Sequence, residues 1–107
     1  MASSEHYLTF VLDQLSELDG ITQRKMMGEY LLYSHGKLFG GIYDDRLLVK
    51  PTPAALALLP DAPQEPPYPG AKPLLLVEQV DDRDLLTRLV QAMEPELPLP
   101  KRKRGRG

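Results

Sequence analysis

Three aspartates stand close together in the second half of the chain, and carboxylates are the groups that bind divalent cations or transfer protons. Asp81, Asp82 and Asp84 form this densest acidic group. They come immediately before an apolar stripe at helical spacing, where an aspartate caps the first turn and favours the positive helix end. We therefore interpret the group as a helix start, and Asp44 with Asp45 as a hairpin turn.

The remaining chemistry-bearing residues are too few and too scattered to form a catalytic or metal centre. There is no cysteine, and the two histidines are His6, at the start of an expected helix, and His35, in an expected turn. No serine lies in a Gly-x-Ser-x-Gly elbow, and the glycines match neither a dinucleotide nor a phosphate loop. We predict no catalytic, cofactor-binding or metal-binding residue, and a protein that is not an enzyme.

Two adjacent methionines suggest a contact surface, because methionine adapts to varied partners. Met26 and Met27 fall within a strand-like segment, so alternation should direct one inward and the other outward. We predict an interaction surface that includes Met27, Lys50 and Tyr68. The alternative hypothesis is a small-molecule-binding protein or enzyme with a pocket near Met26, Lys50 and Tyr68.

The chain has 107 residues, about the length of one domain, and its charge is unevenly distributed. Residues 1–100 carry eight basic and 15 acidic side chains, a formal charge of −7. The last seven positions carry the other five basic residues, which are candidates for nonspecific contact with nucleic acid: Lys101, Arg102, Lys103, Arg104 and Arg106. A disordered, solubilising tail fits the same composition.

Nothing in the sequence predicts export or a membrane span. The N-terminus has acidic and polar residues where a signal peptide needs a basic segment followed by an apolar run. No segment approaches the roughly 20 apolar residues of a spanning helix. We expect a cytoplasmic protein with a protein partner that the sequence does not identify, and the sequence leaves the oligomeric state open.

Helical periodicity and turn signals predict the elements. Residues 4–18 should form a helix capped by Ser3 or Ser4, and residues 22–34 a strand with a bulge or positive φ at Gly28. Turns at residues 35–36 and 44–45 should join it to strands 37–43 and 46–50, which makes a three-stranded antiparallel meander. An apolar, buried helix should follow at residues 54–59, after Thr52 and Pro53.

The second half should add one loop, one or two strands and a helix. Residues 61–73 hold five prolines and should form a loop, with a short edge strand possible at residues 66–68. A strand over residues 74–80 should lead into a helix that reaches Met93, and Pro95, Pro98 and Pro100 should stop that helix. We predict a folded domain over residues 1–94 and a Pro-rich, basic, disordered tail over residues 95–107.

Several of these segments together resemble the N-terminal domain of the TfoX/Sxy family, which is associated with regulation of bacterial natural competence. The resemblance covers residues 5–94 and is carried by Met26-Met27-Gly28, by Gly36-Lys37-Leu38-Phe39, by residues 44–50 (DDRLLVK) and by Pro67-Tyr68-Pro69-Gly70. The chain departs from the family pattern at Met27, where an aromatic residue is more usual, and at Leu76-Val77-Glu78.

The resemblance implies an α+β fold of two layers, similar to secretion chaperones. We expect an antiparallel sheet of about five strands, with helices mainly on one face, in the order αβββαββα. Full-length competence regulators of this family resemble two-domain proteins, whereas this chain resembles the stand-alone members. The function that we expect is therefore a small noncatalytic regulatory or interaction module.

Overall fold

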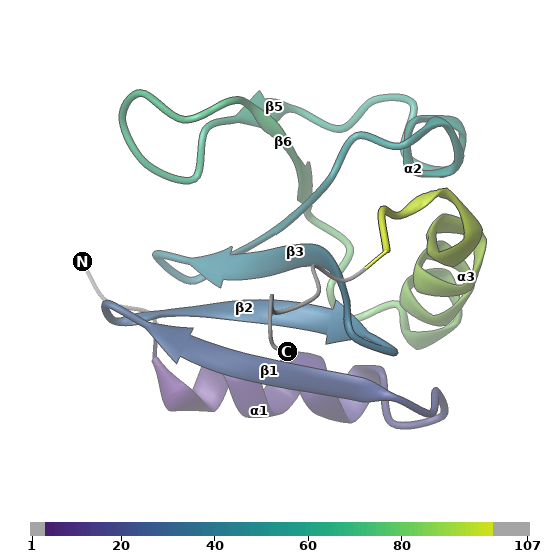
Figure 1. The fold of residues 1–107 in the computed structure, drawn as a ribbon, viewed down its shortest axis with the longest axis horizontal. Helices are drawn as coiled ribbons and strands as arrows, with labels where there is room; N and C mark the ends of the chain where they lie inside the picture. The colour runs from purple at the N-terminus through teal and green to yellow at the C-terminus, as the bar shows by residue number, and fades with distance from the viewer. Residues whose placement is uncertain (1–3, 100–107) are drawn as a thin grey trace, which may run out of the picture.

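The computed structural model describes residues 4–99 and contains one antiparallel sheet with three helices, an α+β fold (Figure 1). The six strands lie in the order β1-β2-β3-β4-β6-β5. The elements are α1 (Glu5–Gln14), β1 (Ile21–Met26), β2 (Glu29–Ser34), β3 (Lys37–Tyr43), β4 (Arg46–Val49), α2 (Pro53–Leu58), β5 (Gln64–Glu65), β6 (Leu74–Val77), α3 (Arg83–Met93) and the 3-10 turn η1 (Glu94–Glu96).

The expected first strand is in fact two strands, so the meander has four strands rather than three. The chain reverses at Met27 and Gly28, whose φ angles are 53° and 86°, and Met26 pairs with Glu29. A two-residue turn with positive φ at both positions matches the twist of the strands that it joins. The expectation of a bulge or a positive φ at Gly28 is confirmed by its positive φ, and Gly28 lies in a turn rather than in a bulge.

The bulge lies in the next hairpin instead. Leu32 pairs with Gly40 and Tyr33 with Leu38, which leaves Phe39 as the extra residue on β3. Both expected turns are confirmed, because His35-Gly36 and Asp44-Asp45 have positive φ at each position.

The three expected helix caps are confirmed. The side chains of Ser4, Thr52 and Asp82 accept hydrogen bonds from the backbone N–H groups three residues later. α1 is shorter than expected, because it ends at Gln14 rather than at residue 18. α2 is more exposed than expected: among its residues only Ala55 is buried, so α2 is a surface helix with a narrow contact.

One hydrophobic core lies between the helices and a single face of the sheet. Alternation directs Tyr30, Leu32 and Ile42 toward this face, where they join apolar side chains from all three helices. In Figure 1 the strands β1 to β3 cross the lower half of the molecule, with α1 below them and α3 to the right. The opposite face, which we call the outer face, is free of helices among residues 4–99.

The segment between α2 and β6 partly covers the outer face. The expected strand at residues 66–68 is wrong, because the edge strand is the two-residue β5 and the prolines after it form a loop. Arg46 on β4 anchors the start of this loop, since its Nη1 donates to Oε1 of Glu65 at 2.6 Å. Leu48 on β4 faces outward and yet is fully buried, which is consistent with a cover over this part of the sheet.

Candidate functional site

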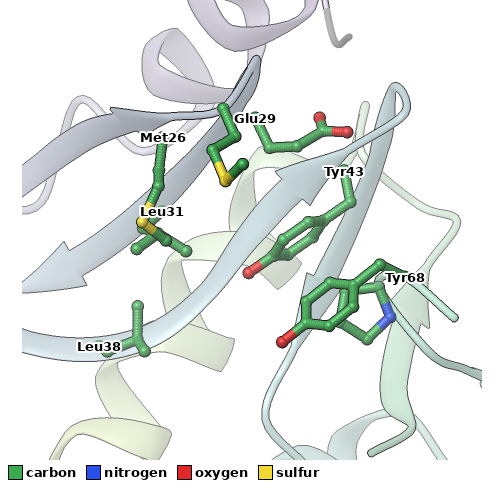
Figure 2. Close-up of a pocket in the computed structure, with 8 residues that line it drawn as sticks. Met26, Glu29, Leu31, Leu38, Tyr43 and Tyr68 are labelled. Atoms are coloured by element: carbon green, nitrogen blue, oxygen red, sulfur yellow. The ribbon is translucent and has the colours of Figure 1, made fainter. Parts of the chain in front are cut away.

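An apolar hollow of about 580 Å³ opens on the outer face, and we call it the outer hollow (Figure 2). Its walls come from both ends of the β1–β2 hairpin turn, from β2 and β3, and from the loop after β5. Its eight lining residues are Met26, Met27, Glu29, Leu31, Leu38, Tyr43, Pro67 and Tyr68. The hollow therefore joins segments that are far apart in the sequence.

Leu31 forms the floor of the outer hollow, and strand alternation determines its direction. Tyr30 and Leu32 face the core, so Leu31 between them faces outward. Leu31 pairs with Gly41, which has no side chain to occupy the space above it. A Cβ atom on Gly41 would lie 2.8 Å from Cε1 of Tyr43, which shows that the Tyr43 ring packs directly against this glycine. The glycine in β3 thus makes room for the aromatic side chain.

Two tyrosines form one wall. Figure 2 shows the rings of Tyr43 and Tyr68 next to each other, with Met26 and Leu31 across from them and Glu29 near the turn. Burial raises the pKa of Tyr43 above its ordinary value of 10.0, and the neighbouring Tyr68 hydroxyl and Glu29 carboxylate raise it further. Tyr43 is therefore a neutral phenol at physiological pH and can donate a hydrogen bond at the edge of an otherwise apolar surface.

The rim of the outer hollow is open to solvent. Met27 is 97% exposed, Tyr68 61% and Met26 50%. The expectation that alternation would bury one methionine is wrong, because Met27 lies in the turn and not in a strand. A second hollow of about 340 Å³ shares Glu29, Pro67 and Tyr68 with the first and continues this surface.

The structure brings together only part of the predicted site. Met26, Met27 and Tyr68 all line the outer hollow, whereas Lys50 does not. Five other residues line the outer hollow and were not predicted from the sequence: Glu29, Leu31, Leu38, Tyr43 and Pro67. Alternation in residues 29–34 could have identified Leu31, had the turn at Met27 been recognised. The five basic candidates at residues 101–106 lie outside the described residues.

A separate polar cluster joins the end of α3 to the β2–β3 turn. The Ser34 hydroxyl donates to Oε1 of Glu94 at 2.5 Å, and Nδ1 of His35 lies 3.2 Å from the same oxygen. Lys37 donates to the backbone carbonyl of Glu94 at 3.3 Å. A serine, a histidine and a carboxylate therefore meet, but the serine hydroxyl donates its hydrogen bond to the carboxylate rather than to the histidine, and Ser34 is buried. This geometry differs from that of a catalytic triad, and it is consistent with a structural contact between the end of α3 and the β2–β3 turn.

The contacts of Glu94 with Ser34 and His35 predict how the stability of the fold depends on acidic pH. The hydrogen bond from Ser34 and then that from His35 hold the pKa of Glu94 below its ordinary value of 4.5. A carboxyl whose pKa is lower in the folded state stabilises the fold above the unfolded pKa, and this contribution disappears as the pH falls through the folded pKa. We expect Glu94→Gln to lower the free energy of unfolding by about 1 kcal/mol at pH 7 and by much less near pH 3.

Urea denaturation at both pH values measures this difference. Glu78→Gln is the matched control, because Glu78 is exposed and its mutation should leave stability unchanged at either pH. An equal loss for Glu94→Gln at pH 7 and pH 3 would contradict the assigned role of the charge.

Three other features bear on function. The described residues contain no group of three or more histidine, aspartate or glutamate side chains placed to bind a metal ion. Asp82 caps α3 by accepting from the N–H of Leu85 at 3.0 Å, as expected for a helix start. Over residues 4–99, none of the helices has the length and apolar character needed to span a bilayer.

Comparison with known proteins gives one family and one uncharacterised relative. The TfoX N-terminal domain model matches residues 13–94. The chain is also similar to an "Uncharacterized 12.7 kDa protein in trpE 5'region" of Spirochaeta aurantia, with 32% identity over 107 residues that cover 99% of this chain and 93% of that protein. No solved structure gives a significant match to the chain.

Proposed function

The chain belongs to the TfoX N-terminal domain family, and we propose that it is a small noncatalytic interaction module that binds a protein partner through the outer hollow. The family match supports a regulatory or interaction module, and the role in competence is what the resemblance implies for the two-domain members. We propose that this module acts in the cytoplasm.

The exposure of apolar side chains at the rim of the outer hollow is the observation that carries this proposal. Met26, Met27 and Tyr68 are long or aromatic side chains held in water on a face that no described helix covers. Contiguous exposed apolar surface is typical of interaction sites, and methionine and tyrosine are enriched in protein interfaces. A partner that covers these groups gains the free energy of removing them from water.

Small-molecule binding is the second candidate, and the size of the outer hollow favours it. A volume of about 580 Å³ lies within the usual range for ligand pockets, roughly 300 to 1,000 Å³. The tyrosine hydroxyls and the Glu29 carboxylate could orient such a ligand. Because the rim is open and Lys50 is not part of the lining, we favour the protein partner over this pocket.

The basic tail is proposed as an additional, weak contact with nucleic acid. Its five cations follow a body that carries a formal charge of −7, and cations near one end of a chain attract phosphates without base specificity. This contribution is separate from the outer hollow and can be measured separately.

Site-specific crosslinking tests the protein-partner proposal. Replacing Tyr68 with a photoreactive phenylalanine analogue keeps an aromatic ring at the rim of the outer hollow. After illumination of cells that express this variant, we expect discrete protein adducts on denaturing gels. The same analogue at Phe10, an exposed aromatic position on α1, is the matched control and should yield few or none.

A second substitution measures the contribution of the rim. Met27→Ser removes an exposed side chain and should weaken capture of the crosslinked partner by about tenfold, the scale of one strong interface contact. Leu56→Ser, at an exposed position on α2, should leave capture unchanged. Equal adducts from Tyr68 and Phe10 would refute the proposed site. Absence of protein adducts, together with a ligand that co-purifies, would favour the small-molecule alternative.

A further inference from the structure

The two edges of the sheet are built differently. The edge strand β5 has two residues, and Pro63 and Pro66 flank it. The edge strand β1 has six residues, none of them proline, and every one after Ile21 is exposed. A sheet edge carries backbone groups that can pair with another strand, and proteins usually protect such an edge by shortening it, adding proline or placing charged side chains on it. β5 is short and flanked by prolines, whereas β1 has six residues, lacks proline and carries two cations.

The register identifies which backbone groups of β1 point outward. The N–H of His35 donates to the carbonyl of Gly20 at 2.8 Å, so these two residues form a hydrogen-bonded pair. Hydrogen-bonded pairs then recur at every second residue of an antiparallel ladder, which directs the backbone groups of Thr22, Arg24 and Met26 toward β2. The N–H and C=O groups of Ile21, Gln23 and Lys25 therefore point away from the sheet. Among residues 4–99, no strand lies beyond them.

The side chains of β1 indicate the charge of a strand that could pair there. Arg24 and Lys25 are adjacent, exposed cations, and alternation sends Arg24 to the outer face and Lys25 to the opposite one. Within the described part of the chain neither side chain makes an ion pair. Two consecutive carboxylates on an added strand would meet one cation on each face.

We propose that the β1 edge binds an extended acidic segment of another protein, which adds to the sheet as a seventh strand. Consecutive carboxylates of this segment lie opposite Arg24 and Lys25. The residue opposite Met26 is apolar and contacts the rim of the outer hollow, because Met26 lies on the β1 edge and also lines the hollow. The inference deepens the proposed function by naming the partner chemistry, and it rests on that function for the partner being a protein.

A second copy of this chain fits the edge less well. Antiparallel pairing of two β1 strands would bring two Arg24 and two Lys25 side chains onto one short ladder without any acid on either strand. Like charges across a ladder are destabilising, and edge cations are a common device against self-pairing. The same charges favour an acidic partner.

The test uses the labelled peptide Thr-Phe-Glu-Glu-Phe-Thr and the full-length chain, followed by fluorescence anisotropy. This peptide places a phenylalanine beside Met26 in either strand direction. We expect saturable binding that Gln23→Pro weakens at least about tenfold, because proline removes an outward N–H but no bond to β2. Gln23→Thr is the matched control, since it retains the N–H and should bind as the wild type does.

Two further measurements keep the test valid even where Gln23→Pro fails to fold. A peptide with N-methyl groups on all of its backbone amides should lose binding to the wild-type chain, because none of its N–H groups can pair with β1. The double variant Arg24→Glu, Lys25→Glu should lose the glutamate peptide and gain the Thr-Phe-Lys-Lys-Phe-Thr peptide. Self-association that depends on Gln23 would instead assign the edge to a second copy and overturn the proposal.

The proposal for the β1 edge and the proposal for the outer hollow can be refuted separately. Glutamate peptide that does not bind at about 1 mM, or that binds equally with and without N-methylation, overturns strand addition. Met27→Ser should reduce peptide binding only slightly. Peptide binding that requires Met27 but not Gln23 would support the outer hollow as the binding site and refute the edge. Peptide binding that requires Gln23 but not Met27 would support the edge alone.

Discussion

Gly40→Ala should lower the free energy of unfolding by about 3 kcal/mol, a large part of the stability of a domain this size. A Cβ atom at Gly40 would lie 2.2 Å from the Leu48 carbonyl oxygen and 2.9 Å from the Val49 Cα. Both atoms are backbone of β4, so no flexible side chain can move aside. The added methyl group must separate β3 from β4 beside the Phe39 bulge.

Thermal and urea denaturation measure this effect. For a domain of about 100 residues, 3 kcal/mol corresponds to a fall in Tm of roughly 12 to 24 °C. Gly70→Ala is the matched control, because a Cβ atom there meets nothing within 4 Å although φ is 88°. It should cost only the backbone preference, about 1 to 2 kcal/mol. Equal losses at both glycines would show that the close approach to β4 is not the cause.

The same region shows why the sequence predicted the hairpins unevenly. Asp44-Asp45 and His35-Gly36 contain residue types that tolerate positive φ, so both turns could be predicted. Met27 has no such preference, and its turn lies inside residues 22–34, which the sequence indicated as one continuous strand. Sheet pairing on either side imposes the positive φ there. Because one turn was missed, the expected strand count was about five and the observed count is six.

Local signals were enough for the helix starts but not for the candidate site. The caps at Ser4, Thr52 and Asp82 involve neighbours three residues away, which a sequence pattern contains. The contact between Ser34 and Glu94 joins residues 60 positions apart. The outer hollow likewise needs Tyr68 from a proline-rich loop beside Tyr43 from β3. No periodicity encodes where such a loop lies, so Tyr68 could be proposed as a contact residue but its neighbours could not.

The salt dependence of nucleic-acid binding should be the largest effect in a functional assay. Five tail cations make at most five phosphate contacts, which gives a log-affinity versus log-salt slope no steeper than about −4.5 on duplex DNA. Affinity should then fall by up to about 500-fold between about 50 and 200 mM salt. Near physiological salt we expect dissociation constants of roughly 10⁻⁴ to 10⁻⁶ M, weakened further by the acidic body.

Anisotropy titrations over a salt series separate the tail from the folded body. A variant with serine at Lys101, Arg102, Lys103, Arg104 and Arg106 should show no measurable binding at any point of the salt series. The double variant Arg24→Ser, Lys25→Ser should keep the wild-type affinity and slope, because two cations on an acidic body attract phosphates weakly. If the tail variant binds as the wild type does, the contact belongs to the folded domain, and the edge cations of β1 become the next positions to test. A sequence preference that persists at high salt would refute the electrostatic mechanism, because charge attraction alone distinguishes no base sequence.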